Sequence, residues 1–159
     1  MTSREQSKPD RTARAGSAPA PGTSPALAKP LPVATPTSAP FWEGLRRGEL
    51  RIQRCEVCRA WVFHPRSNCP RCLSPKLAWQ TVPGTGRLHT YTIARVPTAP
   101  FFADEVPQLL AIIELDEGVR IPSTLVGVTE DEIEIGMPVA PVFEATEGGE
   151  SVLLRFRKA

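Results

Sequence analysis

The pattern of hydrophobic and polar residues in the second half of the chain consists of short extended runs separated by turn residues. The first run, 87–96 (RLHTYTIARV), has the period of two of a half-buried strand and is rich in Thr, Tyr, Ile and Val. Similar runs follow at 109–115, 121–126, 139–144 and 152–156. Turn residues stand between them at 116–118 (DEG), 136–138 (GMP) and 148–149 (GG). These five runs predict five short strands.

No repeating helical pattern interrupts these runs, so the strands are expected to form an antiparallel barrel or sandwich. Their number fits a small Greek-key barrel of the oligonucleotide/oligosaccharide-binding type, the OB-fold. The stretch 129–136 (TEDEIEIG) is expected to form a short helical turn or bend between the third and fourth strands. The fold class is therefore mainly β.

A short helix is predicted at 41–50 (FWEGLRRGEL), ahead of the strands. Helical spacing places Phe41, Trp42 and Leu45 on one side and charged residues on the other. Two glycines make this helix weak by itself, so burial of its aromatic pair must stabilise it. The surface that buries the pair is either the chain's own domain or a partner protein.

The first 40 residues differ in composition from the rest of the chain. They contain eight prolines, eight alanines and ten serines or threonines, with few large apolar residues. So little apolar area cannot offset the entropy of ordering the segment, which is expected to be a disordered Pro/Ala-rich arm. The arm lacks a secretory apolar run, and the chain lacks a transmembrane stretch, so a cytoplasmic protein is expected.

All four cysteines lie within residues 55–72, CEVCRAWVFHPRSNCPRC. They form two CxxC pairs, Cys55 with Cys58 and Cys69 with Cys72, with ten residues between the pairs. Each pair can form a tight turn that aims two sulfurs at one point, and the linker can bring the two turns face to face. We therefore expect four thiolates around one metal ion. Zinc is the expected ion, and iron is the alternative that the same tetrahedron accepts.

Four cysteine ligands would close the shell of the metal, whereas a catalytic zinc keeps one position open for water. A structural zinc is therefore expected. Disulfides would need an oxidising compartment, which nothing in the sequence indicates, and a thiol redox motif would not need a second CxxC pair. His64 and His89 are expected to be ordinary structural or exposed residues.

Charge divides the chain into three parts, which coincide with the expected domains. The arm, 1–40, has a balance of +3, the helix with the zinc ribbon, 41–76, has +5, and the barrel, 77–159, has −6. Zinc ribbons and OB-folds both occur in nucleic-acid-binding proteins, so nucleic-acid binding is the alternative function. The acidic barrel would repel a phosphate backbone, and its strands offer few stacking rings, so this function is disfavoured.

The order of these motifs resembles a known family. A FWEGL helix precedes the ribbon CEVC, FHPR, CPRC, and then come a GTGRLHTYT strand, a PQLLAIIELDEGVRIPSTLVGV hairpin and an EIGMPVAPVFE strand. Over residues 41–157 this order is similar to the acyl-CoA-associated zinc-ribbon and OB-fold proteins first catalogued as domain of unknown function thirty-five. The resemblance implies a rubredoxin-like zinc ribbon in front of a five-stranded OB-fold barrel.

Members of this family act as small partner subunits of thiolases, hydroxymethylglutaryl-CoA synthases, MaoC-like hydratases or steroid side-chain aldolases. The resemblance thus implies a non-catalytic accessory subunit in acyl-CoA metabolism that helps to assemble a complex and contributes to CoA binding. The residues agree with the lack of a catalytic role, because all four thiols are assigned to metal. The sequence also contains no GxSxG, P-loop or HExxH motif.

Several residues are candidate contacts for CoA or a partner. Arg59, Arg66 and Arg71 around the ribbon could bind the CoA phosphates, because guanidinium pairs well with phosphate. The alternative is a solvated positive face that keeps the ribbon soluble or docks an acidic partner. The candidate partner contacts are Phe41, Trp42, Phe101 and Phe102.

The loop 96–108 (VPTAPFFADEVPQ) carries two of these candidates, Phe101 and Phe102, between prolines. Adjacent side chains of an extended segment point in opposite directions, so one ring is expected to enter the barrel and the other to face outward. The alternative is that both rings cover the open end of the barrel.

The chain departs from the family pattern at two positions. Many knuckles of this kind have glycine directly after CxxC, where a positive φ is convenient, but this chain has Arg59 and Leu73 there. Both residues can still adopt the turn at some cost in free energy.

Overall fold

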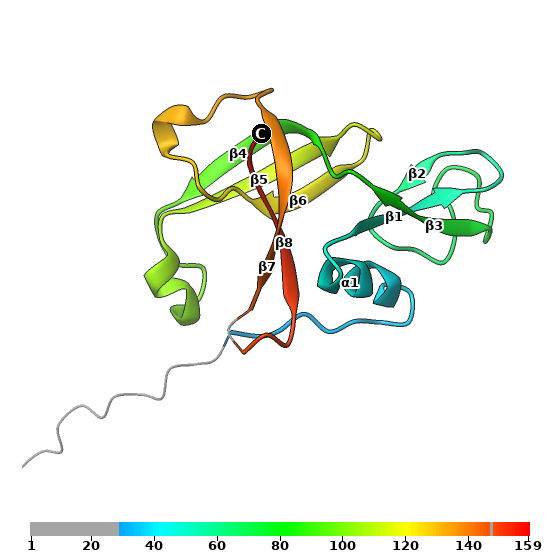
Figure 1. Ribbon diagram of the computed structural model, residues 1–159, viewed down its shortest axis with the longest axis horizontal. Helices are drawn as coiled ribbons and strands as arrows, with labels where there is room; N and C mark the ends of the chain where they lie inside the picture. The colour runs from blue at the N-terminus through cyan, green and yellow to red at the C-terminus, as the bar shows by residue number, and fades with distance from the viewer. Residues whose placement is uncertain (1–28, 147) are drawn as a thin grey trace, which may run out of the picture.

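The computed structural model describes residues 29–146 and 148–159 (Figure 1). Within these residues, a short helix leads into a small three-stranded ribbon, which is followed by a five-stranded barrel. Figure 1 shows the ribbon to one side of the barrel and the helix beside both. Most of the predicted disordered arm lies outside the described residues, and residues 29–38 of it lead into the helix through a turn at 36–38.

The helix α1 (Ala39–Arg46) begins and ends earlier than the predicted 41–50. Pro40 fits its first turn, where the backbone N–H has no helical partner to lose. Gly48, with φ of 71°, reverses the chain after the helix, so the last predicted residues leave it. Neither α1 nor any other helix in the described part of the chain has the length and apolar character needed to cross a membrane.

The ribbon is an antiparallel sheet in the order β2-β1-β3. Its strands are β1 (Leu50–Cys55), β2 (Trp61–Val62) and β3 (Leu77–Val82). None of these three strands was among the five predicted from the sequence. β3 follows the expected domain boundary at residue 77 but pairs with β1 along its whole length, so the ribbon sheet continues to Val82.

The barrel consists of the five strands that the short runs predict, each with slightly different ends. They are β4 (Gly86–Ala94), β5 (Gln108–Leu115), β6 (Arg120–Thr124), β7 (Pro138–Ala145) and β8 (Val152–Lys158). The sheet order is β6-β5-β4-β7-β8, with antiparallel neighbours. A parallel bridge between Leu125 and Phe156 joins the end of β6 to β8 and closes the barrel in the OB-fold manner.

Two 3₁₀-helices interrupt the barrel's loops. The turn expected at 129–136 is confirmed as η2 (Glu130–Glu132), which has a capping box between Thr129 and Glu132. The second helix, η1 (Pro100–Glu105), occupies the loop that was expected to be extended, so the prediction that its rings point in opposite directions is wrong. Phe101 and Phe102 lie against each other with centroids 4.8 Å apart, and both are half-buried.

One hydrophobic core runs through the helix, the ribbon and the barrel. Phe41 and Leu45 of α1 and Ile52 of β1 pack in the same cluster as barrel residues such as Ile113 and Phe156. These side chains are at most 8% exposed. A second, smaller cluster of Cys55, Val62 and Cys69 lies in the ribbon. The ribbon therefore has almost no apolar core of its own around the cysteines.

Candidate metal centre and adjoining groove

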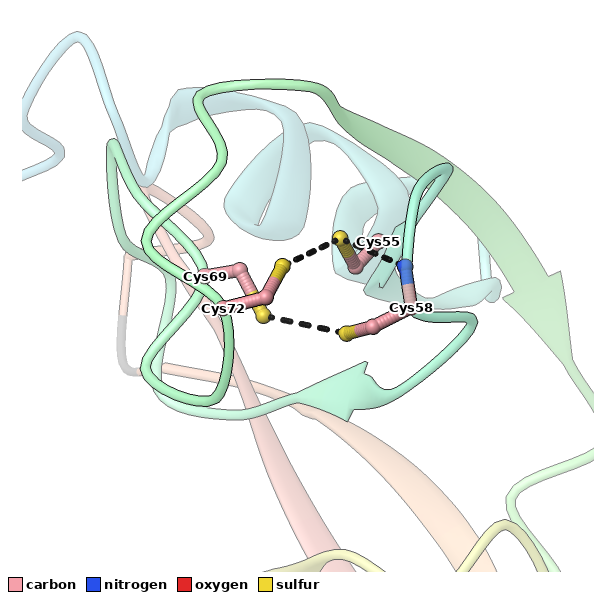
Figure 2. A group of neighbouring side chains, drawn as sticks. All are labelled: Cys55, Cys58, Cys69 and Cys72. Carbon is pink, nitrogen blue, oxygen red and sulfur yellow. Dashed lines mark hydrogen bonds between the residues drawn. The ribbon is translucent and has the colours of Figure 1, made fainter.

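The four cysteines come together at one end of the ribbon, from two similar turns (Figure 2). Cys55 is the last residue of β1, and the N–H of Arg59 donates to its carbonyl at 3.0 Å. In the second turn the N–H of Leu73 donates to the carbonyl of Cys69 at 2.9 Å. Each CxxC is thus closed by a hydrogen bond from the residue that follows it.

The spacing of the sulfurs fits a tetrahedral metal site. Their Sγ atoms all lie within 4.8 Å of one another, with 3.6 Å between Cys55 and Cys72 and between Cys58 and Cys69. A zinc ion with four Zn–S bonds of about 2.3 Å requires sulfurs about 3.8 Å apart. The distances are too long for a disulfide, whose S–S bond is about 2.05 Å. The geometry therefore supports the predicted metal and not a disulfide.

The residues that follow the two CxxC pairs adopt a backbone conformation that normally favours glycine. Arg59 and Leu73 both have φ of 62°, in the left-handed region. Among the described residues other than glycine, they are the two with positive φ. This conformation costs a residue with a Cβ about 1–2 kcal/mol. The ribbon therefore needs a stabilising term beyond its small core, and metal binding can supply it.

The hydrogen bonds and burial of the cysteines give their thiols different pKa values. The N–H of Cys58 lowers the pKa of the Cys55 thiol to about 6, although burial opposes this shift. Burial raises the pKa of Cys69, but backbone N–H groups that donate to its sulfur outweigh it, and the net shift is downward. The N–H of Ser74 lowers the pKa of Cys72, yet burial and the three neighbouring sulfurs raise it to about 12. Four thiolates can thus coexist here when a metal compensates their charge.

Gln53 on β1 holds the linker between the two turns. Its side chain is 5% exposed, and its Nε2 donates to the carbonyl of Arg66 at 3.0 Å while its Oε1 accepts from the N–H of Arg66 at 2.8 Å. Both polar atoms are therefore paired, as a buried amide requires. This role of Gln53 could not be predicted from the sequence, because a polar side chain in a short strand does not reveal which distant backbone it meets.

A groove of about 540 Å³ lies between α1, the segment after β2, the loop of η1 and the barrel strands β5, β6 and β8. Its lining is mainly apolar and includes Trp42, Leu45, Phe63, Phe102, Leu110 and Leu153. This size and character are typical of ligand pockets, which have about 300–1,000 Å³ and a few polar groups. The sequence did not indicate the groove, because its walls come from segments far apart in the chain.

Arg155 places a charge in this apolar lining. Its Nη1 donates to Thr124 Oγ1 at 2.6 Å, and its Nε lies 2.6 Å from Glu144 Oε2. The Nε is not aligned for a hydrogen bond to the carboxylate, so this contact is an ion pair. The side chain is 18% exposed, so the pair is partly shielded from water. The available signal in the sequence was that Arg155 is the one charged residue of the predicted run 152–156, VLLRF.

The predicted partner contacts lie at or near this groove. Phe41 lines the groove although it is only 8% exposed, and its ring packs 5.8 Å from that of Phe63. Trp42 is half-buried and packs edge-on against Phe41 with centroids 5.2 Å apart. Phe102 lines the groove, and Phe101 lies beside it. Their role in partner binding stays a prediction.

The predicted CoA-phosphate contacts, Arg59, Arg66 and Arg71, are exposed on the ribbon and do not line the groove. A fourth arginine of the ribbon, Arg54, stacks its guanidinium over Trp61 at 4.9 Å from the ring centroid. Contact between the three arginines and phosphate stays a prediction.

The two histidines lie in different places. His64 lines the groove with its ring 4.3 Å from that of Phe63. His89 sits at an irregularity in β4, and its Nδ1 lies 3.6 Å from Glu114 Oε2. The fold thus brings a carboxylate to His89 that the sequence did not show. Glu114 is already paired with Arg120 at 2.8 Å, and this hydrogen bond lowers the pKa of the carboxyl.

Two domain families match the chain, in the order in which the structure has the two parts. Residues 42–78 match "ChsH2, rubredoxin-like zinc ribbon domain", and residues 79–144 match "ChsH2, C-terminal OB-fold domain". The first match spans all four cysteines, whose geometry fits a tetrahedral ion. The site therefore holds a structural zinc.

Individual relatives carry three kinds of name. A probable enoyl-CoA hydratase alpha subunit of Thermomonospora curvata is 39% identical over 117 residues, 72% of this chain but 35% of its own length. The chain thus spans about a third of that relative. A DUF35 domain-containing scaffold protein of Methanothermobacter thermautotrophicus is 36% identical over 70% of this chain and 84% of its own. The solved structure "Ltp2-ChsH2(DUF35) aldolase" matches with a TM-score of 0.72 and 35% identity, covering 80% of this chain and 98% of that one.

Proposed function

Because the chain belongs to the family of ChsH2-type, or DUF35, zinc-ribbon and OB-fold proteins, we propose that it is a non-catalytic accessory subunit of an acyl-CoA-processing enzyme. Its partner would be thiolase-like, MaoC-like hydratase or aldolase-like. The names of the relatives support this proposal, since they include scaffold proteins, hydratase alpha subunits and a subunit solved with an aldolase.

The metal centre supports a structural role for the ribbon. Zinc with four cysteine ligands has no open position for water or substrate, so it stabilises the fold without activating a nucleophile. The same four thiols are the complete cysteine content of the chain. A thioester-transfer reaction would need a free thiol beside a base, so the partner would supply the catalytic groups.

The groove supports a second part of the proposal, which is that the subunit also contacts the substrate. It is apolar along most of its lining and closed on several sides by α1, the loop of η1 and the barrel. An acyl chain would bury its methylene groups there, at about 0.8 kcal/mol each. The exposed Arg59, Arg66 and Arg71 are the candidate contacts for the CoA phosphates. We thus assign the acyl part of CoA thioesters to the groove.

Two measurements test this function. Co-expression with a hydratase-like or aldolase-like subunit encoded beside it should give one eluting complex, and the partner's activity should fall without this chain. Full activity of the partner alone, with no co-elution, would defeat the accessory role. Titration of a long-chain acyl-CoA into the Leu153→Asp variant should show weaker binding than wild type. The matched control is Val96→Asp, because Val96 is 77% exposed and does not line the groove.

A further inference from the structure

The outer edge of the ribbon sheet is open in the described part of the chain. β3 is the last strand in the order β2-β1-β3. The N–H of Glu56 donates to the carbonyl of Lys76 at 3.0 Å, so the carbonyl of Lys76 faces β1. Backbone groups of successive residues in an antiparallel strand point to opposite sides. Every second residue after Lys76 therefore faces β1, and the backbone groups of Trp79 and Thr81 face away from it.

The pairing of β1 with its other neighbour agrees with this assignment. The N–H of Cys55 donates to the carbonyl of Ala60 at 2.9 Å, on the side of β2, so the adjacent Arg54 faces β3. Arg54 stands opposite Ala78 in the β1–β3 register. Among the described residues, no backbone group pairs with the outward N–H and carbonyl groups of Trp79 and Thr81.

This edge lacks the features with which proteins usually block strand addition. Exposed edges commonly carry a charged residue, a proline or a bulge. β3 reads LAWQTV, with no charge and no proline, and its register with β1 is unbroken over six pairs. Pro75 and Pro83 stand just outside the strand and limit any added strand to this length. Gln80 and Thr81 are exposed, so their edge is accessible to solvent.

The charges beside the edge indicate what it can bind. Arg51 stands opposite Thr81 in the register, and Lys76 precedes the strand. The whole segment 41–76 has a balance of +5, and the zinc with its thiolates leaves it positive. A second copy of the chain would bring two such positive ribbons together, which opposes self-pairing. An extended segment with acidic side chains would pair with the edge and also complement its charge.

We propose that β3 binds an extended acidic segment of the acyl-CoA-processing partner, which adds to the ribbon sheet as a fourth strand. This inference rests on the proposed accessory function and identifies its contact surface. Trp79 and Thr81 offer the added strand two N–H donors and two carbonyl acceptors. Strand addition of this kind derives its affinity from main-chain hydrogen bonds. Arg51 and Lys76 favour acidic side chains in the added strand.

Amide hydrogen exchange of the full chain, read residue by residue by NMR, tests the geometry. In the free chain, the amides of Ala78 and Gln80 should exchange slowly and those of Trp79 and Thr81 quickly. In the complex with the co-eluting hydratase-like or aldolase-like subunit, Trp79 and Thr81 should become protected. A complex that leaves these two amides unprotected overturns the edge proposal and leaves the accessory function standing. If no complex forms, both proposals fall.

A pair of variants tests the role of the main chain. Thr81→Pro removes the outward N–H and leaves the bonds to β1 in place, so it should weaken the complex by about tenfold. Thr81→Val keeps the N–H and should bind as wild type does. Equal affinities for the two variants, at wild-type thermal stability, would overturn the proposal. If Thr81→Pro fails to fold, the exchange experiment on the unmodified chain decides.

A second pair tests the chemistry of the occupant. Thr81→Glu should weaken the complex, and Thr81→Lys should bind at least as tightly as Thr81→Val. The reverse order would exclude an acidic segment. Sedimentation of the free chain tests whether a second copy occupies the edge. A dimer in which the amides of Trp79 and Thr81 are protected from exchange would overturn the proposal.

Discussion

Leu73 offers a direct test of how much strain the second cysteine turn stores. Its φ is 62°, and its side chain is 75% exposed. Replacing it by Ala or by Gly removes the same side-chain contacts, but only Gly removes the Cβ that makes this conformation costly. The difference in free energy of unfolding between Leu73→Gly and Leu73→Ala therefore isolates the backbone strain.

The expected difference follows from two opposing terms. Relief of the left-handed conformation stabilises the Gly variant by about 1–2 kcal/mol. The greater freedom of glycine in the unfolded chain costs it about 0.4–1 kcal/mol. We therefore expect Leu73→Gly to be more stable than Leu73→Ala by about 0.5–1 kcal/mol. Zinc binding is coupled to folding of the ribbon, so the zinc affinity of the Gly variant should be higher by up to about fivefold.

Urea unfolding of the zinc-loaded protein and zinc competition against a chelator measure these two quantities. Val57 provides the control, because it is an exposed residue of the first turn and has no positive φ. Val57→Gly should therefore be less stable than Val57→Ala by about 0.5–1 kcal/mol. If Leu73→Gly is also less stable than Leu73→Ala, the positive φ stores no strain and the reasoning is refuted.

Three further expectations concern the ribbon and the barrel. Chelation of zinc should unfold residues 50–76, and an unchanged circular dichroism spectrum would contradict this. Gln53→Met should cost about 1–3 kcal/mol in urea unfolding, because the backbone N–H and carbonyl of Arg66 lose their partners. An unchanged unfolding midpoint would show that these two hydrogen bonds do not stabilise the fold. Arg120 lowers the pKa of Glu114. Their ion pair should therefore stabilise the fold fully above the unfolded carboxyl pKa of about 4.3. This stabilisation should be lost as the pH falls through the lower pKa of the folded state. Arg120→Gln should flatten the acid dependence of Tm, and an unaltered dependence would refute the assignment.

The acyl-CoA and strand-edge proposals involve different parts of the molecule. The groove lies against the barrel and α1, whereas the open edge belongs to the ribbon sheet. Leu153→Asp should therefore affect ligand binding, and Thr81→Pro should affect assembly. A variant that changes both readouts equally would indicate that ligand and partner share one surface.

The sequence by itself determined the features that depend on short stretches of chain. Two CxxC pairs ten residues apart can converge on one ion, so the metal ligands were readable without coordinates. Short extended runs bounded by turn residues marked all five barrel strands, and the first of them, 87–96, also alternated with a period of two. The positions of Arg59 and Leu73 after the cysteine pairs likewise indicated where the backbone would be strained.

Only the tertiary structure decided features that join distant segments. The pairing of β3 with β1 in the ribbon sheet could not be predicted from the sequence, because the two strands lie more than twenty residues apart. Three other features depend on how separate elements pack: the groove, the hydrogen bonds between Gln53 and Arg66, and the contact between His89 and Glu114. A local pattern records which face of an element is buried, but long-range pairing is selected by the free energy of the whole core. The residues that hold zinc could therefore be named from the sequence, whereas the surfaces proposed to meet acyl-CoA and partner could not.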